Sequence, residues 1–192
     1  MTTATLVITM YSDWLIATNE GQGLADASPV KDVNGLPYIP GRSIRGLLRD
    51  ATRLLSVDGR LQDEVFGTRS SDGADTAAIT PGQVSISDAV VTREVAEAVI
   101  NKSVSAQDLY TIRRQTSIES STGTAQRGSL RSIEVVIPGL TLIAEVAGPD
   151  GAIDWLKKSA PLVQHLGHGR SRGLGRCRMQ LTSATNSKEA AS

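Results

Sequence analysis

The sequence of 192 residues contains few of the side chains on which several protein classes depend. It has one cysteine and two histidines, and aromatic residues make up only 3% of the chain. Such a chain can form neither an internal disulfide nor a zinc site built from cysteine and histidine. A platform of several aromatic rings on which nucleic-acid bases stack is not expected either. If this chain binds nucleic acid, it must hold the backbone.

Long apolar runs and an excess of charge of either sign are also missing. No stretch is long enough to cross a membrane, and the N-terminus lacks the basic and apolar layout of a signal peptide. Twenty basic residues balance twenty acidic ones, which argues against a polycationic coat but leaves room for a local basic groove. Hydrophobic residues make up 40%, enough for a core. We expect a cytoplasmic protein with a single domain over residues 1–182, no membrane contact, and a disordered tail over residues 183–192.

The stretch around which the chain is organised is LPYIPGRSIRGLLR, residues 36–49. Its two prolines predict extended backbone, and apolar residues at helical spacing predict a helix over about 43–56, with Ser43 capping the first turn. Free N–H groups at a helix start, together with arginines, suit a phosphate. A solvated amphipathic helix after a proline-rich turn is the alternative. The candidate RNA contacts here are Arg42, Ser43, Arg45, Arg49 and Arg53.

A second basic stretch, GHGRSRGLGR, covers residues 167–176. Its four glycines allow backbone N–H groups to approach a phosphate closely, and its arginines can clamp the anion. It is not a Walker loop, because it lacks the Gly-Lys-Ser/Thr ending and follows a helix. We favour anion binding over a flexible basic connector. The candidate contacts are His168, Arg170, Ser171, Arg172 and Arg176.

The remaining pattern predicts an α+β fold. Alternating or helical periodicity gives the order strand, helix, strand, strand, helix, strand, which is the βαββαβ order of a ferredoxin-like (RRM-like) sandwich. The polar stretch over about 108–134 is predicted as an inserted hairpin and not as a packed element, and residues 68–80 as a disordered loop. The other predicted elements are strands over 4–10, 14–16, 83–92 and 177–182, a strand over 135–146 that is interrupted at Pro138-Gly139, weak helical periodicity over 93–105, and a helix over 153–166.

Asp26 is the most distinctive acidic residue, since it lies in a loop of small residues without a basic partner at helical spacing. Such a carboxylate can orient a ribose hydroxyl, bind a divalent ion through water, or act as a base. An Asx-type turn is the commoner alternative. Asp32, just before Asn34-Gly35, is more clearly a turn residue.

Several segments, taken in order, resemble the RAMP (repeat-associated mysterious protein) superfamily of CRISPR systems. Residues 38–49 resemble its IPG-S-(L/I)-(K/R)-G-x-x-R signature, and residues 167–175 its C-terminal glycine-rich loop. Phe66-Gly67 and Ser87-Asp88-Ala89 are similar to its FG and (I/V)-x-D-A segment. Residues 122–136 resemble the thumb of the backbone subunits of type III effector complexes. The resemblance runs from about residue 15 to residue 179.

This resemblance implies a modified ferredoxin-like fold and copies of the chain stacked along a guide RNA beside other subunits of the complex. The arginines named above would hold the guide, and thumb residues such as Arg113 and Arg127 would contact RNA. Asp26 and Asp32 match the spacing of two family aspartates, so Asp26 would assist cleavage of the guide-paired target RNA in a reaction that needs a divalent metal such as Mg²⁺. The chain departs from the family in lacking His over 14–18 and in having Glu119 after Ile118.

Three functions follow from these expectations. The first is a guide-binding backbone subunit that cleaves target RNA with Asp26, as a metal-dependent endoribonuclease in antiviral defence. The second is a guide-binding subunit without catalytic activity, in which Asp26 is a turn residue. The third, ranked last, is a guide-processing nuclease, because such enzymes usually use a His in the first half of the chain and both His here lie near its C-terminal end.

Overall fold

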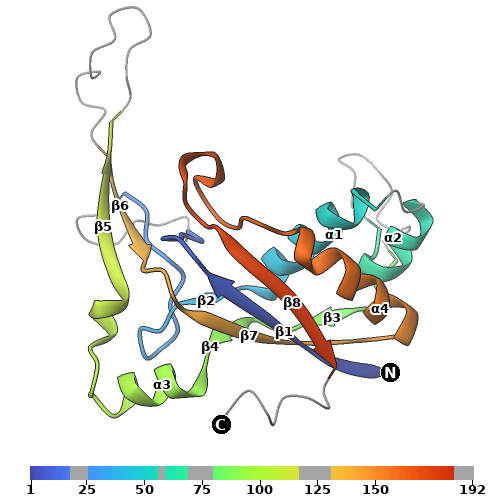
Figure 1. The fold of residues 1–192 in the computed structure, drawn as a ribbon, viewed down its shortest axis with the longest axis horizontal. Coiled ribbons are helices and arrows are strands. Elements are labelled where there is room, and N and C mark those ends of the chain that lie inside the picture. The colour runs from blue at the N-terminus through green and yellow to red at the C-terminus, as the bar shows by residue number, and fades with distance from the viewer. Residues whose placement is uncertain (18–25, 56–58, 69–79, 117–130, 184–192) are drawn as a thin grey trace, which may run out of the picture.

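The computed structural model describes residues 1–17, 26–55, 59–68, 80–116 and 131–183. They form an α+β fold, as predicted, with one large antiparallel sheet and a separate two-stranded hairpin (Figure 1). The large sheet has the order β2-β4-β7-β1-β8, with β3 also paired to β7. Its strands are β1 (Thr2–Met10), β2 (Tyr38–Ile39), β3 (Ser85–Ile86), β4 (Ala89–Val91), β7 (Thr141–Gly148) and β8 (Cys177–Ser183). The helices are α1 (Gly41–Arg53), α2 (Gly59–Phe66), α3 (Arg93–Ile100) and α4 (Asp150–Ser159).

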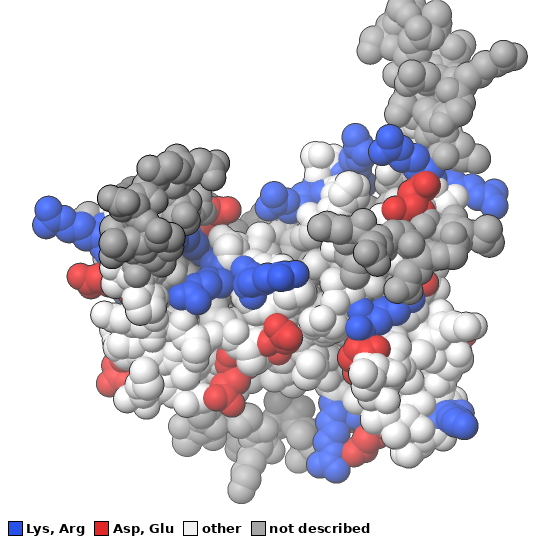
Figure 2. Space-filling model, turned by 180° about the vertical axis from the view of Figure 1, so that it is seen from behind, with Lys and Arg blue, Asp and Glu red and all other residues white. Residues whose placement is uncertain are grey.

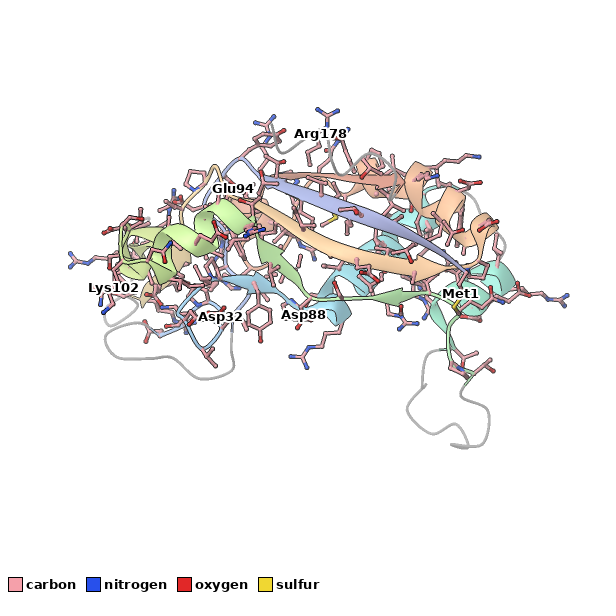
Figure 3. All side chains as sticks on the ribbon, turned by 90° about the horizontal axis from the view of Figure 1, so that it is seen from below. Met1, Asp32, Asp88, Glu94, Lys102 and Arg178 are labelled. Atoms are coloured by element: carbon pink, nitrogen blue, oxygen red, sulfur yellow. The ribbon has the colours of Figure 1, made fainter. Side chains whose placement is uncertain are left out.

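The core lies between the sheet and the helices α1 and α4. Alternate residues of β1, such as Leu6 and Ile8, are fully buried, because successive side chains of a strand point to opposite faces. They belong to one apolar cluster with Ile44 and Leu48 of α1 and Leu156 of α4. Arg178 on β8 and Asp88 between β3 and β4 lie at opposite edges of the sheet (Figure 3). Helices α1 and α4 therefore cover one face of the sheet.

Two helix predictions need correction at their ends. The first helix begins at Gly41 and ends at Arg53, so Ser43 lies inside the first turn and makes no capping hydrogen bond. The second begins at Asp150 and ends at Ser159, where a 3₁₀ turn η3 (Ala160–Leu162) follows, because Pro161 lacks the N–H that an α-helix would continue to use. No helix among the residues described here is long and apolar enough to cross a membrane.

The strand predictions hold for β1 and β8 and fail in part elsewhere. The predicted strand over 83–92 is divided into β3 and β4 at Ser87-Asp88, although both parts pair with β7. Residues 14–16 are not a regular strand; Trp14 makes a single bridge to Val136. The strand over 135–146 is interrupted at Pro138-Gly139, as predicted, but its two parts belong to different sheets. The α3 segment confirms the helical periodicity expected after Thr92.

The predicted hairpin is confirmed at its base. β5 (Tyr110–Gln115) and β6 (Arg131–Val136) pair antiparallel, after a 3₁₀ turn η2 (Ala106–Leu109). The expectation that this segment does not pack is wrong for β6, whose Ile133 and Val135 form a buried cluster with Leu15 and Leu174. Residues 69–79, 117–130 and 184–192, which contain most of the predicted loop, the hairpin tip with Arg127, and the tail, lie outside the described residues.

Candidate nucleic-acid interface

The conformation of the glycine loop, residues 167–176, is fixed by its glycines. The loop contains a short 3₁₀ turn, η4 (Arg170–Arg172), and its four glycines all have positive φ. A Cβ at Gly167 would overlap the carbonyl oxygen of Leu15, and a Cβ at Gly175 would overlap that of Leu166. At these two positions glycine is therefore required by close packing of the chain on itself, and not only by access of a ligand to the backbone.

The polar side chains of the glycine loop point outward. All five predicted contacts are exposed, and the loop carries three arginines within seven residues. A rigid backbone that displays several guanidinium groups can bind phosphates with little loss of conformational entropy, because the backbone is ordered before binding. These five residues are His168, Arg170, Ser171, Arg172 and Arg176.

The α1 arginines divide into two kinds. Arg42 is exposed at the start of the helix, and Arg53 is exposed near its end, 3.8 Å from Asp50. Arg49 is only 11% exposed in its side chain, and it donates to the carboxylate of Asp63 at 2.6 Å and to the Gly67 carbonyl at 2.8 Å. The guanidinium of Arg49 therefore joins α1 to α2 within the fold.

Arg45, like Arg49, binds a backbone carbonyl at the end of α2. Its guanidinium donates to the carbonyl oxygen of Phe66 at 3.0 Å, and its side chain is partly buried. Both arginines thus hold the end of α2 and the turn after it, where the Phe66-Gly67 segment lies. Ser43 is partly buried on α1 between Arg42 and Arg45. Of the predicted α1 contacts, Arg42 and Arg53 present exposed side chains.

The start of α1 is fixed by a residue whose role the sequence did not indicate. The N–H of Gly41 donates to Oδ1 of Asp88 at 2.7 Å. Asp88 thereby satisfies a free donor of the first turn, the role expected of Ser43. In the sequence, Asp88 is marked by its place near the end of a predicted strand and by the family resemblance of Ser87-Asp88-Ala89, and neither of these indicates a helix cap. Because its partner is 47 residues away, no local pattern could reveal the contact.

A short connecting segment, Ser12–Leu15, joins the glycine loop to the hairpin. On one side, Ser12 Oγ accepts the N–H of Arg176 at 2.9 Å, and the carbonyls of Asp13 and Leu15 accept the N–H groups of Gly175 and His168, each at 2.8 Å. The connecting segment therefore fixes the position of the glycine loop through three backbone donors of that loop.

On its other side, the connecting segment holds the base of the hairpin. Trp14 and Val136 exchange both backbone hydrogen bonds, at 2.9 and 3.0 Å. The carboxylate of Asp13 forms an ion pair with the guanidinium of Arg113 on β5, and Asp13 is only 9% exposed. The charge of Arg113, a predicted RNA contact, is therefore partly neutralised by Asp13, although half of the Arg113 side chain remains exposed.

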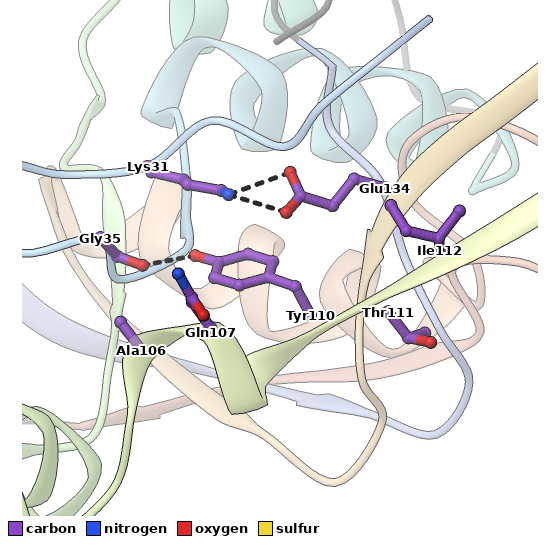
Figure 4. A pocket seen from close by; sticks show the side chains of 8 residues that line it. All are labelled: Lys31, Gly35, Ala106, Gln107, Tyr110, Thr111, Ile112 and Glu134. Atoms are coloured by element: carbon purple, nitrogen blue, oxygen red, sulfur yellow. Dashed lines mark hydrogen bonds and ion pairs between the residues drawn. The ribbon is translucent and has the colours of Figure 1, made fainter. Parts of the chain in front are cut away.

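The other side of the hairpin base holds a pocket of about 360 Å³ (Figure 4). Lys31 reaches both oxygens of Glu134, at 2.9 and 3.0 Å, and its ammonium lies 3.9 Å from the centre of the Tyr110 ring. The Tyr110 hydroxyl donates to the Gly35 carbonyl at 2.6 Å. Burial raises the pKa of Tyr110 above its usual value, and the nearby Glu134 and Asp32 raise it further. This cluster fixes the hairpin against residues 31–35.

The two predicted aspartates lie beside this hairpin base. Asp32 is the turn residue that we predicted, since its Oδ1 accepts the N–H groups of Asn34 and Leu36, each at 2.8 Å. Asp26 is exposed and exchanges hydrogen bonds with Ser132 of β6, where its Oδ2 accepts the backbone N–H at 2.8 Å. One oxygen of Asp26 thus anchors the hairpin.

No group of three or more His, Cys, Asp or Glu that could hold a metal ion is found in the part of the chain that the structure describes. Asp26 contributes one exposed carboxylate at the hairpin base.

Basic side chains gather along one band of the surface. In Figure 2 they line the upper part of the face shown, from the α1–α2 end of the molecule toward the hairpin, while most acidic side chains on this face lie lower. A chain without net charge therefore has a local positive region, as the sequence allowed.

Residues 7–178 match the family described as the RAMP superfamily. The chain belongs to the RAMP superfamily. The match covers both stretches that the sequence singled out, the α1 start and the glycine loop. None of the curated proteins compared with this chain matches its sequence.

Solved structures share the fold of this RAMP protein at low sequence identity. One is a chain of the type III-B Cmr-beta complex bound to cognate target RNA, with a TM-score of 0.68, 18% identity, and coverage of 95% of this chain and 61% of that one. A second comes from the apo state of Cmr-beta, with a TM-score of 0.68, 10% identity, and coverage of 94% and 97%. A third, from a type IV-B CRISPR complex, has a TM-score of 0.65, 15% identity, and coverage of 95% and 91%.

Because these identities are low, the likeness establishes a common fold and does not transfer an activity. The RAMP protein spans about three fifths of the length of the Cmr-beta chain bound to target RNA. It spans nearly the whole of the chains from the apo Cmr-beta and type IV-B structures.

Proposed function

We propose that this RAMP protein is a guide-RNA-binding subunit of a CRISPR effector ribonucleoprotein and holds the RNA backbone with the exposed arginines of its glycine loop. The observation that carries this proposal is the loop itself, a turn fixed by Gly167 and Gly175 that displays three exposed arginines. Its other partners would be target RNA, different subunits of the complex, and further copies of the chain along the guide. The structural neighbours, which are chains of CRISPR complexes, support this assignment.

We further propose that the core is a modified ferredoxin-like sandwich. The order β1, α1, β3/β4, β7, α4, β8 supports this interpretation, as does the sheet order β8-β1-β7-β4. In this arrangement the end of β1 lies beside the start of β8, where Met10 pairs with Cys177. The connecting segment follows β1 and the glycine loop precedes β8, so both lie at this end of the two strands. This arrangement places the proposed RNA contacts together.

The direct test measures binding of the full chain to a labelled single-stranded RNA. Replacing Arg170 and Arg172 by Ala is expected to weaken binding about tenfold or more, because each removes a phosphate contact. The matched control replaces Lys157 and Lys158 of α4, which removes the same charge elsewhere and should leave affinity nearly unchanged. Equal losses in both variants would show nonspecific electrostatic attraction only and contradict a site at the loop.

Purification of the chain with its partner subunits gives a second test. A guide-binding subunit should retain small RNAs of uniform length, and the loop variant should lose them. RNA of random length, or none, in the assembled complex would contradict guide binding.

Asp26 motivates a finer proposal, that the subunit also cleaves target RNA paired to the guide. In this reaction the 2′-hydroxyl oxygen attacks the adjacent phosphorus and the bond to the 5′ oxygen of the next nucleotide breaks. Asp26 would accept the proton of the 2′-hydroxyl, water would protonate the leaving oxygen, and the products would be a 2′,3′-cyclic phosphate and a 5′-hydroxyl. The hydrogen bond from Ser132 holds one carboxylate oxygen and leaves the other available for this proton.

Two variants of Asp26 separate chemistry from hairpin anchoring. Asp26→Asn keeps an oxygen that can accept the Ser132 N–H but cannot act as the base, whereas Asp26→Ala removes both functions. Loss of cutting in both, with RNA binding retained in the Asn variant, supports catalysis. Cutting by the Asn variant rejects Asp26 as the base, and a complex that never cuts supports the non-catalytic alternative.

The expected need for Mg²⁺ stays a prediction. A magnesium ion usually keeps several waters and takes one or two carboxylates together with substrate phosphates, so Asp26 and RNA phosphates would supply its ligands. Cleavage that continues in excess chelator would reject this requirement.

A further inference from the structure

We propose that Asp13 is a positioning residue that sets the glycine loop and the hairpin at a fixed distance from each other. This proposal rests on the proposed RNA binding by these two elements. Its basis is that Asp13 contacts two different elements, one through its backbone carbonyl and the other through its carboxylate. The backbone carbonyl of Asp13 accepts the Gly175 N–H, and its carboxylate holds the Arg113 guanidinium.

The burial of Asp13 indicates why its contact with Arg113 can fix the position of β5. Asp13 is 9% exposed, so its carboxylate has lost most of its water and depends on Arg113 for compensation. Arg113 is half exposed and lies on β5, which pairs along its length with β6. Removing the charge of Asp13 therefore removes the side-chain contact between the connecting segment and β5, while the pairing of β5 with β6 remains.

The other contacts of the connecting segment make Asp13 the point at which the two elements meet. Ser12 and Leu15, on either side of it, hold the glycine loop through the N–H groups of Arg176 and His168. Trp14 holds β6 through Val136. A shift at Asp13 consequently changes the separation between the arginines of the loop and those of the hairpin. An RNA backbone could then no longer reach both places in the same geometry.

The direction in which RNA affinity changes distinguishes this positioning role from a purely electrostatic effect. Replacing Asp13 by Asn removes a negative charge near a polyanion, so charge alone predicts tighter RNA binding. The positioning role predicts the opposite, about a tenfold weaker affinity and a smaller dependence on salt, because fewer phosphates are bound. The control Asp154→Asn removes a carboxylate on α4 and should change neither quantity.

A double-mutant cycle then tests whether Arg113 acts through Asp13. If it does, the variants Asp13→Asn and Arg113→Gln each weaken binding, and the double variant is no weaker than the weaker single variant. If Arg113 instead contacts RNA independently of Asp13, the two effects add, and the positioning role of this pair is rejected.

Folding is monitored in the same variants by replacing Trp155 with Phe, so that Trp14 in the connecting segment is the single tryptophan that remains. The Asp13→Asn protein should melt cooperatively while the emission of Trp14 shifts. If Asp13→Asn unfolds the chain, the folded Arg113→Gln variant decides: weaker binding together with a shift of the Trp14 emission supports the proposal, whereas unchanged binding, or weaker binding without that shift, overturns it. Unchanged or tighter RNA binding by a folded Asp13→Asn protein also overturns it, whereas failure of the unmodified chain to bind RNA overturns the proposed function instead.

Discussion

The arginines of α1 and those of the glycine loop look alike in the sequence but have different uses in the structure. On α1, the guanidinium groups of Arg45 and Arg49 are directed to carbonyls and a carboxylate at the end of α2. In the glycine loop, the backbone is fixed by internal contacts and the arginine side chains remain exposed. The comparison teaches that a basic cluster near glycine can stabilise a turn or display charge, and that the partners and exposure of the guanidinium groups distinguish the two.

The largest expected effect concerns the backbone of the loop. Gly175→Ala should destabilise the protein by about 3 kcal/mol or more, because it adds αL strain to a clash with the Leu166 carbonyl. Gly173 is the matched control, since it has a similar φ of +79° and no atom within 4 Å of an added Cβ. Gly173→Ala should cost about 1 kcal/mol. Denaturant unfolding measures both, and equal costs would contradict a loop fixed by close packing.

The α1 side of the comparison predicts a stability effect of intermediate size. Arg49→Ala should cost about 2 kcal/mol, since it removes hydrogen bonds to Asp63 and to the Gly67 carbonyl from a mostly buried guanidinium. Arg53→Ala should change stability by no more than about 0.5 kcal/mol, because its ion pair with Asp50 is exposed. A similar loss for both variants in thermal or denaturant unfolding would erase the distinction between the two kinds of arginine.

The loop arginines should instead change binding and leave stability unaltered. For the Arg170→Ala and Arg172→Ala double variant, the slope of log affinity against log salt concentration should fall by about 0.7 for each phosphate that the protein no longer neutralises. Its unfolding midpoint should match that of the unmodified chain. A midpoint that falls with an unchanged salt slope would place these arginines in the structural group with Arg49.

The sequence predicted those features that depend on neighbouring residues. The alternation of β1 gave its buried face, and the spacing in the region of Ile44 and Leu48 gave the helix. The Asx turn at Asp32 and the hairpin base were predicted for the same reason. The start of α1 was predicted less well, because Asp88, a residue between two strands of the sheet, accepts the first-turn N–H in place of the expected Ser43 cap.

The contacts that organise the candidate interface could not be predicted in this way. The Asp13–Arg113 pair joins residues 100 positions apart, and the Lys31–Glu134 pair joins residues 103 apart. Each depends on how the hairpin folds back onto the start of the chain. The same holds for Arg45 and Arg49 of α1, because their partner residues lie on α2, a helix that the sequence pattern did not predict, or directly after it. Exposure of the loop arginines was predictable only as a consequence of their charge.

The smallest expected effect on stability is at the hairpin base, where the Tyr110 hydroxyl is held by the fold. Tyr110→Phe removes the hydrogen bond to the Gly35 carbonyl and should cost about 1 kcal/mol at neutral pH. The raised pKa of Tyr110 adds a pH signature. Because the folded state binds this proton more tightly than the unfolded state, stability is fully present below the usual tyrosine pKa of about 10 and decreases as the pH rises above it. The difference in stability between the two proteins should therefore shrink at alkaline pH. A constant difference would show that the fold does not hold the Tyr110 proton.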